Sequence, residues 1–358
     1  MPSSSSPSAV SSVPASLTEE RRIVKPRLVR SLVATIAVVL AAAACGVSVT
    51  PSPSAGTPLT VGLGFLPSVQ FAPFYLADRA GYYRDAGINV TFQNRIDPDL
   101  VTLVGQGAID IGLADGTSVI PAVSQGIPIR YLATVYATYP SIVFAKASSG
   151  IKDAPDLEGR RLGIPGRFGS SWIMLQALLR SADLTPDDLE IFTYPDFGQG
   201  AAVAADQVDA ATGFANNEPV QLQLSGEEVN ILRVDNVIAL PGPGLISSTT
   251  TIGSKADAVA AFVAQTLRAM REIAADPDKG LDAAIAAVPE LGQNRATQRA
   301  ILVATIEMWQ SDLTRAEGLG AVDRAGWIES IAFLNELGLV AKPVSIDELV
   351  DARFIPVD

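Results

Sequence analysis

The 358-residue sequence contains no histidine. Ser-His-Asp catalysis, Cys-His catalysis and histidine-ligated zinc are therefore excluded, because each needs an imidazole group. Cysteine occurs once, as Cys45, so the chain cannot form an internal disulfide. No two acidic residues stand out as a catalytic dyad, although carboxylate pairs remain possible. The sequence gives no support for an enzyme, and we predict no catalytic residue, no metal and no cofactor.

Basic residues are also scarce, with 26 Lys and Arg against 38 Asp and Glu. The formal net charge of −12 argues against binding to nucleic acid and against an electrostatic attachment to anionic lipid. Aromatic residues make up 6% of the chain and charged residues 18%, whereas 48% are apolar. This composition is typical of a globular α/β protein, and the length favours two lobes.

The first 44 residues differ from the rest. A Ser/Pro-rich stretch and a basic segment precede the apolar run "SLVATIAVVLAAAA", which ends directly before Cys45. This order is typical of a secretory signal, and the run is shorter than the roughly 20 residues that a spanning helix needs. The sequence "AAACG" resembles a bacterial lipobox, in which the cysteine is freed by cleavage and carries the lipid.

We therefore predict a signal peptide over residues 1–44, a lipidated Cys45, and a flexible tether that completes the segment 45–57. Removal of the signal would change the net charge from −12 to −15, because it carries five basic and two acidic residues. The pair Arg21 and Arg22 leaves the twin-arginine route open beside general secretion. The alternative for Cys45 is a free, buried thiol.

From residue 58 onward, strand and helix patterns alternate. "LTVGLGF", "FAPFYLADRAGYYRDAG" and "INVTFQ" predict one strand–helix–strand unit, with Gly87 ending the helix, and "RRLGIPG", "SSWIMLQALLRSA" and "LEIFTYP" predict another. The segments "GQGAIDIGLADGTS" and "AADQVDAATGFANNEP" repeat one order: helix end, aspartate, apolar strand, polar helix start. Asp110 and Asp209 occupy the same place in this repeat. Two α/β lobes of similar construction are predicted.

We assign residues 58–138 and the mostly helical residues 247–358 to lobe 1, and residues 139–246 to lobe 2. The extended segments "YATYPSIVFA" and "LISSTTTIG" are predicted to be two hinge crossings, with a ligand cleft between the lobes. Trp309 and Trp327 lie in amphipathic helical patterns and are predicted to be core residues.

Loops at the carboxyl ends of strands line the ligand crevice in open α/β folds, and free N–H groups at helix starts bind polar atoms. Phe65 ends a strand just before Pro67, so we expect its ring to project and to stack on a flat ligand. Gly166 and Gly169 either let the backbone approach a ligand or simply form a tight turn. The predicted ligand-binding residues are Phe65, Ser68, Gln70, Phe71, Asp115, Thr117, Ser118, Arg167, Phe168, Ser170, Ser171, Asn217 and Glu218.

These side chains are mostly uncharged donors and acceptors beside aromatic rings. A small anion calls for converging cations, and Arg167 is the one cation in these loops. A flat heteroaromatic ligand is therefore favoured. A small anion held by Arg167 and the following helix start remains the alternative.

The stretches "VGLGFLPSVQFAPFYLADRAGYYRDAGINV", "GQGAIDIGLADG" and "DLEGRRLGIPG" resemble the type II periplasmic substrate-binding proteins of ABC importers. The similarity covers about residues 58–345 and is greatest to the branch that binds aliphatic sulfonates, thiamine pyrimidine precursors and riboflavin. The resemblance implies two α/β lobes that close on a small molecule and deliver it to a membrane permease driven by an ATPase.

In the pyrimidine binders of that branch an aromatic residue, often Trp, stands where Phe65 is, and Asn is common where Ser68 is. Both positions differ here. The resemblance implies that Glu218 reaches a ring amine or amide. "VQFAPFYLAD", "GIPGRFGSSWIMLQALL" and "NNEPVQL" are more similar to the riboflavin-binding members. Eukaryotic relatives that build the thiamine pyrimidine consume an active-site histidine, which this chain lacks.

We therefore expect a monomeric, lipid-anchored binding protein on the outer face of the cytoplasmic membrane. Its expected ligand is a flat heteroaromatic vitamin or precursor of the riboflavin or thiamine-pyrimidine type. A binding protein for an aliphatic sulfonate or nitrate is the alternative. An enzyme acting on a similar compound, or a purely structural surface lipoprotein, is the remaining possibility.

Overall fold

The computed structural model describes residues 56–94 and 99–356. All of them belong to one compact unit, Ser54–Asp358. The predicted signal peptide, Cys45 and nearly all of the tether lie outside the described residues. Among the residues that are described, no helix is long and apolar enough to cross a membrane.

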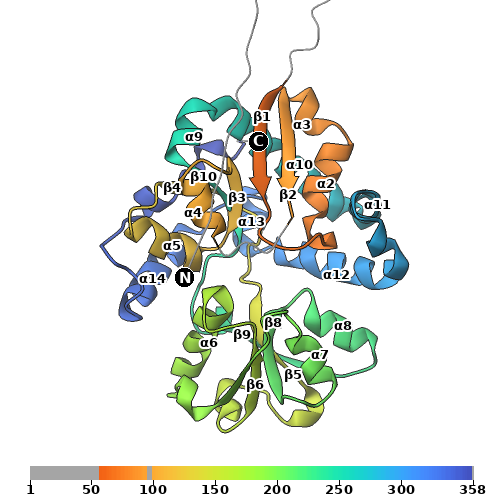
Figure 1. Cartoon of the computed structure of the whole chain (residues 1–358), viewed down its shortest axis with the longest axis vertical. Helices are drawn as coiled ribbons and strands as arrows, with labels where there is room; N and C mark the ends of the chain where they lie inside the picture. Colours follow the sequence, from red (N-terminus) through yellow and green to blue (C-terminus); the bar gives the residue numbers. More distant parts are fainter. Residues whose placement is uncertain (1–55, 95–98, 357–358) are drawn as a thin grey trace, which may run out of the picture. The chain divides into compact units, whose positions relative to one another are not determined.

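The first sheet has the strand order β2-β1-β3-β10-β4 (Figure 1). Its strands are β1 (Thr57–Gly62), β2 (Ile88–Gln93), β3 (Ile111–Ala114), β4 (Ile129–Thr134) and β10 (Gly244–Ser248). Strand β1 runs parallel to β2 and β3, whereas β10 runs antiparallel to β3 and β4. We call this sheet and the helices packed on it lobe 1.

The second sheet has the order β7-β6-β8-β5-β9. Its strands are β5 (Ser141–Lys146), β6 (Arg161–Ile164), β7 (Glu190–Thr193), β8 (Ala210–Phe214) and β9 (Val229–Arg233). Strand β6 is parallel to β7 and β8, and β5 is antiparallel to β8 and β9. With its helices α6 (Gly169–Ser181), α7 (Gln199–Ala204) and α8 (Glu218–Leu224), this sheet forms lobe 2. The predicted α/β fold with two sheets is confirmed.

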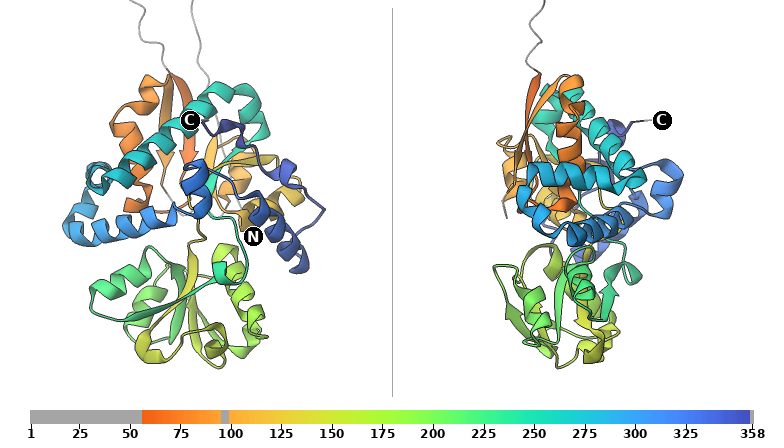
Figure 2. Two further views of the ribbon diagram at one scale, coloured as in Figure 1. Left: turned by 180° about the vertical axis from the view of Figure 1, so that it is seen from behind. Right: turned by 90° about the vertical axis from the view of Figure 1, so that its right-hand side faces the viewer.

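The last third of the chain is helical and packs around the first sheet, as Figure 2 shows. The helices outside lobe 2 are α2 (Ala72–Arg79), α3 (Tyr82–Asp85), α4 (Leu100–Gly105), α5 (Gly116–Ser124), α9 (Thr249–Ser254), α10 (Ala256–Ala275), α11 (Pro277–Ala287), α12 (Arg295–Met308), α13 (Asp312–Glu317), α14 (Arg324–Glu336) and α15 (Ile346–Leu349). A short 3-10 helix, η2 (Val69–Phe71), precedes α2.

Helix α10 illustrates how the sequence pattern produces this packing. Val259, Phe262, Val263 and Leu267 recur at spacings of three and four residues and are all buried, so one face of the helix packs against α2 and α11. The ring of Phe262 stacks on that of Phe74, with 6.2 Å between the centroids. Burying such a ring contributes roughly 1.5–3 kcal/mol. The aromatic residues of α2 are therefore mainly core, as predicted.

Two predicted elements differ from the structure. The helix expected over residues 71–87 is divided into α2 and α3, because Gly81 adopts a left-handed backbone with φ of 78°. The second crossing was predicted at "LISSTTTIG", residues 245–253. These residues instead form β10 inside the first sheet and the helix α9. The β-branched run pairs with two neighbouring strands, and the crossing lies earlier, at residues 234–243.

The first crossing, residues 135–140, overlaps the first half of the predicted "YATYPSIVFA" segment, residues 136–145, whose second half forms β5 instead. Trp309 and Trp327 are each 1% exposed, so their prediction as core residues is confirmed. One cluster of buried side chains includes residues of α5 in lobe 1 and of α6 in lobe 2, and the two helices are in contact. Lobe 1 and lobe 2 therefore share part of a hydrophobic core.

Candidate functional site

Aromatic rings from the two lobes meet at the carboxyl ends of their strands. Phe65 follows β1 in lobe 1, and Phe197 precedes α7 in lobe 2. Their ring centroids lie 5.5 Å apart, with an interplanar angle of 83°. This edge-to-face geometry is favourable for aromatic pairs. Phe65 therefore lies in a loop, as predicted, and contacts a ring of the opposite lobe.

A buried polar chain also connects the lobes. Asp115, which precedes α5, accepts hydrogen bonds from the Thr117 hydroxyl at 2.6 Å and from the Ser118 backbone N–H at 3.0 Å. The hydroxyl of Tyr139, in the first crossing, lies 3.2 Å from Thr117 Oγ1 and 3.4 Å from the carbonyl oxygen of Ser170. Four predicted site residues are thus brought together through Tyr139.

Burial governs the ionisation of this chain. It raises the pKa of the Asp115 carboxyl, although the hydrogen bonds from Thr117 and Ser118 act in the opposite direction. Burial also raises the pKa of the Tyr139 hydroxyl well above its ordinary value, and the charge of Asp115 adds to this effect. Tyr139 therefore remains a neutral hydroxyl at physiological pH.

A second polar group lies where α12 of lobe 1 contacts lobe 2. Asn216, just after β8, donates its Nδ2 hydrogen to Thr305 Oγ1 at 2.8 Å. The Tyr136 hydroxyl, in the first crossing, donates to Gln70 Oε1 at 3.3 Å. Burial raises the pKa of Tyr136, with smaller opposing effects from the nearby Asn216 and Thr305 side chains.

Apolar residues of lobe 2 support this contact, since Ala215 and Val220 pack against the core of lobe 1. We refer to the meeting point of the two lobes as the lobe junction. It comprises Phe65, Gln70, Thr117, Tyr136, Tyr139, Ser170, Phe197, Asn216 and Thr305.

Two predicted site residues of lobe 1 have local roles. Ser68 caps η2, with its hydroxyl oxygen 3.4 Å from the Gln70 backbone nitrogen. Phe71 is 4% exposed and packs 6.4 Å from Phe74, inside the core of lobe 1. Its ring lies in the core, whereas Phe65 lies at the lobe junction.

The predicted residues around the start of α6 are more exposed. The guanidinium carbon of Arg167 lies 5.4 Å from the centre of the Trp172 ring, a cation–π contact. Phe168 is 65% exposed and covers the backbone of Gly166, where an added Cβ would clash with the ring. Ser171 is half-buried in the first turn of α6.

The predicted residues at the start of α8 bond within lobe 2. Asn217 Oδ1 accepts a hydrogen bond from Gln221 Nε2 at 2.9 Å. Glu218 Oε2 accepts from the backbone N–H of Phe214 at 2.9 Å. Burial raises the pKa of the Glu218 carboxyl, and the bond from Phe214 partly opposes this effect. Glu218 therefore stabilises the end of β8 in this arrangement.

Five residues of the lobe junction were absent from the predicted set: Tyr136, Tyr139, Phe197, Asn216 and Thr305. A signal was available for some of them. The two tyrosines lie in the predicted crossing "YATYP", and Asn216 is the direct neighbour of the predicted Asn217. Phe197 lies in the loop that follows the carboxyl end of β7 and could have been found by the rule that identified Phe65. Thr305 lies inside a long amphipathic helix and carried no comparable signal.

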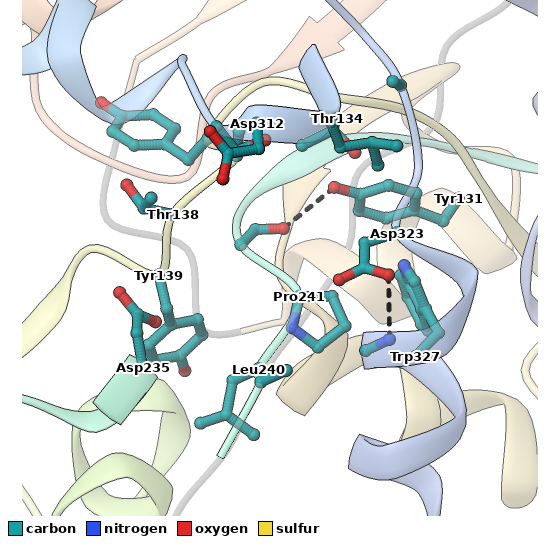
Figure 3. Close-up of a pocket in the computed structure, with 18 residues that line it drawn as sticks. Tyr131, Thr134, Thr138, Tyr139, Asp235, Leu240, Pro241, Asp312, Asp323 and Trp327 are labelled. Atoms are coloured by element: carbon teal, nitrogen blue, oxygen red, sulfur yellow. Dashed lines mark hydrogen bonds between the residues drawn. The ribbon is translucent and has the colours of Figure 1, made fainter. Parts of the chain in front are cut away.

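A cavity of about 360 Å³ lies beside the crossings and helices α13 and α14, and the junction residues Tyr136 and Tyr139 line part of it (Figure 3). Thr138 and Tyr139 of the first crossing line it, as do Leu240 and Pro241 of the second. The Tyr131 hydroxyl donates to the Gly242 carbonyl at 3.0 Å across its wall. None of the predicted site residues lines this cavity.

The carboxylates of this cavity already have partners. Asp235 is paired with Arg233 at 2.7 Å, and Asp312 with Arg315 at 2.7 Å. Asp323 accepts backbone hydrogen bonds at the start of α14. These three carboxylates are thus used in local structure, and we take the lobe junction as the candidate ligand site. Among the described residues, no group of three or more His, Cys, Asp or Glu could hold a metal ion.

Comparisons with known proteins bear on family and fold. The profile of the family described as NMT1/THI5 like matches residues 68–280. The riboflavin-binding protein RibY of Chloroflexus aurantiacus is 34% identical over 86% of this chain and 89% of its own length. A 4-amino-5-hydroxymethyl-2-methylpyrimidine phosphate synthase of Legionella pneumophila is 29% identical, over 51% of this chain and 57% of its own.

Among solved structures, the periplasmic aliphatic sulphonate-binding protein SsuA of Escherichia coli superimposes with a TM-score of 0.65. It covers 82% of this chain and 97% of SsuA, at 17% identity, and at that identity it is evidence for the fold. The predicted type II periplasmic binding protein fold is therefore confirmed. Because the family profile matches more than half of the chain and the RibY match spans most of both sequences, this chain belongs to the NMT1/THI5-like family.

Proposed function

We propose that the protein is the extracytoplasmic substrate-binding component of an ABC importer and that it binds a flat heteroaromatic compound of the riboflavin type at the lobe junction. The contact between Phe65 and Phe197 carries this proposal, because it brings two rings from opposite lobes to one place. A planar ligand offers both rings a large apolar face.

The backbone at Phe197 supports a functional role for its ring. Phe197 adopts φ of 61°, a left-handed conformation that costs roughly 1–2 kcal/mol for a residue other than glycine. A glycine, which would adopt this conformation without strain, occurs at the next position, Gly198, but not at position 197 itself. A large ring at the strained position is consistent with selection for ligand contact rather than for backbone stability.

The relatives support the same ligand class. The RibY match is the one named above that spans most of both chains, and RibY is named for riboflavin binding. The synthase match covers about half of each chain. Since the sequence has no histidine, the histidine-consuming chemistry implied for the eukaryotic synthases is not available to it. Binding without turnover is therefore the proposed activity.

The proposed location follows from the N-terminal sequence. A lipid on Cys45 would hold the folded unit at the outer face of the membrane, where a binding protein meets its permease and ATPase. Metabolic labelling with a palmitate analogue tests this. The parent chain should be labelled and Cys45→Ser should not. Equal labelling and fractionation of both would contradict lipidation at Cys45.

The ligand is tested by titrating the purified protein with riboflavin, thiamine, hydroxymethylpyrimidine, taurine, an alkanesulfonate and nitrate. Riboflavin should raise the melting temperature as its occupancy rises, by a free energy of RT ln(1 + [L]/Kd). Stacking should also quench flavin fluorescence. Chromatography of the released ligand should recover it unchanged, whereas a converted product would favour an enzyme.

A small anion is the alternative ligand, because Arg167 is an exposed cation just before α6 and could hold a sulfonate or nitrate. Arg167→Ala should leave riboflavin binding within about twofold, and Arg180→Ala, at the other end of α6, is the matched control. Stabilisation by the anions alone, abolished in Arg167→Ala and kept in Arg180→Ala, would overturn the heteroaromatic assignment.

A further inference from the structure

Asn216 combines deep burial with an amide oxygen that finds no hydrogen-bond donor among residues 56–94 and 99–356. The side chain is 1% exposed. Its Nδ2 donates to Thr305 Oγ1, while its Oδ1 lacks a partner within the described residues. A buried amide oxygen without a donor is unfavourable, because it loses its hydrogen bond to water and gains none in return.

The neighbouring groups fix which way this amide faces. The hydroxyl of Thr305 has a single proton, and it donates that proton to the Ile301 carbonyl at 2.7 Å. In this arrangement Thr305 Oγ1 accepts from Asn216, so the NH2 group of Asn216 faces it. The oxygen then points away from α12.

The next hydroxyl is also committed. Tyr136 has one proton and donates it to Gln70 Oε1 at 3.3 Å. It therefore does not serve Asn216 Oδ1 in this arrangement. Asn216, Thr305, Tyr136 and Gln70 thus form a group in which both hydroxyl protons are used and the Asn216 Oδ1 acceptor is left over.

The position of that acceptor matters, because three parts of the fold meet there. Asn216 follows the carboxyl end of β8 in lobe 2, Thr305 lies on α12 of lobe 1, and Tyr136 lies in the first crossing. Gln70 lies in η2, five residues after Phe65. A compound that contacts the Phe65 ring would therefore lie close to the segment that reaches Tyr136 through Gln70.

We propose that Asn216 Oδ1 is a specificity-determining acceptor, which receives a hydrogen bond from an N–H or O–H group of the bound heteroaromatic compound as the lobes close. This rests on the proposed function and adds a chemical requirement to it. The site should select flat ligands that carry a donor and reject otherwise identical ligands in which that donor is blocked, because the amide oxygen would then stay unpaired.

Three flavins test this requirement directly. Riboflavin has both an imide N–H on its ring and hydroxyl groups on its side chain. 3-Methylriboflavin lacks the imide N–H, and lumiflavin lacks the hydroxyl groups. The parent protein should bind one of the modified flavins about tenfold more weakly than riboflavin. In Asn216→Ala, riboflavin should itself bind about tenfold more weakly, and the difference between the flavins should shrink to within twofold.

Two further variants separate this role from a structural one. Asn216→Leu keeps the side-chain volume and removes the amide, so it completes the comparison if Asn216→Ala does not fold, as judged by circular dichroism. Asn230→Ala is the matched control, because Asn230 Nδ2 donates to the Ile151 carbonyl at 2.8 Å within lobe 2. It should leave all three affinities and their ratios unchanged.

The outcomes are distinguishable. If the parent protein binds none of the three flavins, the proposed function fails and this inference fails with it. If it binds them but shows the same ratios in the parent protein and in the Asn216 variants, the function stands and the inference is wrong. Equal affinity of the parent protein for all three flavins would also overturn the inference, since the oxygen would then be satisfied by something other than a ligand donor.

Discussion

Lobe 1 and lobe 2 order their strands in the same way, and an aspartate joins the same two strands in each. Asp110 Oδ2 accepts from the Thr60 backbone N–H at 2.9 Å, ahead of β3. Asp209 Oδ2 accepts from the Arg161 backbone N–H at 2.9 Å, ahead of β8. The repeat seen in the sequence is thus a repeat of structure, and these carboxylates position the strands whose carboxyl ends reach the lobe junction.

The two aspartates differ in the origin of their cation. Asp110 pairs at 2.8 Å with Lys255, which comes from the helical return of the chain. Asp209 pairs at 2.7 Å with the guanidinium of Arg161, the same residue whose backbone N–H it accepts. Lobe 1 therefore depends on residues far apart in sequence, whereas lobe 2 is built from one continuous segment. This difference predicts that replacing Asp110 destabilises the protein more than replacing Asp209 does.

The largest expected effect is on stability. Asp110→Ala should lower the free energy of unfolding by about 2 kcal/mol, because it removes the acceptor of the Thr60 N–H and the carboxylate paired with Lys255, at a site less exposed than that of Asp209. Asp209→Ala should cost about 1 kcal/mol, because its pair is more exposed and solvent screens it. Urea unfolding of both variants measures this, and a larger loss for Asp209→Ala would contradict the asymmetry.

The second comparison sets one ring of each lobe against the other. Phe65→Ala and Phe197→Ala should each weaken riboflavin binding about five- to tenfold, since one stacking ring contributes roughly 0.5–1.5 kcal/mol beyond its burial. Phe192→Ala is the matched control, because Phe192 is 37% exposed, as Phe197 is, but lies on β7. Titration followed by flavin fluorescence measures the riboflavin affinity of all three variants. A loss in Phe192→Ala equal to that in Phe197→Ala would remove the case for a paired aromatic site.

Much of this fold can be predicted from the sequence. Strands and helices alternate along the chain and each has its own hydrophobic period, and the Asp repeat marks equivalent strands in the two lobes. The errors have local causes. Gly81 was not recognised as a left-handed break within one apolar helix pattern. Strand β10 was assigned to a crossing, since nothing in a short β-branched run shows that it inserts antiparallel between β3 and β4.

The site is less readable. The rule that loops follow the carboxyl ends of strands led to Phe65, Thr117 and Ser170, which the structure places at the lobe junction. It could not supply Thr305, because that residue reaches the junction through the packing of α12 against α8, a contact between distant segments. It also could not show that the ring of Phe71 turns into the core.

A third comparison concerns carboxylates with opposite pKa shifts. Burial raises the pKa of Asp115 above its unfolded value. Between the unfolded and the folded pKa the folded state therefore holds more protons, and stability should fall as pH rises through this range. The hydrogen bond from Arg161 lowers the pKa of Asp209, so its contribution is present above the unfolded value and is lost as pH falls toward the folded one.

Each contribution can be removed separately. Asp115→Asn keeps an acceptor for the Ser118 N–H and should flatten the decline on the neutral side of the ordinary carboxyl pKa of about 4. Asp209→Asn should instead flatten the loss on the acid side. Urea unfolding across a pH series tests both. A profile of Asp115→Asn that parallels the parent chain on the neutral side would show that Asp115 does not carry this dependence.

The smallest expected effect on stability concerns the turn before each aspartate of the repeat, where lobe 1 has a glycine and lobe 2 has an aspartate. Three positions before each aspartate of the repeat, Gly107 adopts φ of 74° and Asp206 adopts φ of 55°. An added Cβ at Gly107 meets nothing within 4 Å, so Gly107→Asp tests the backbone alone. It should cost about 1 kcal/mol or less, because aspartate tolerates this conformation better than most residues do. Gly107→Val, with a β-branched side chain, should cost more in the same urea experiment, and equal stabilities of the two variants would show that the turn relaxes out of the left-handed region.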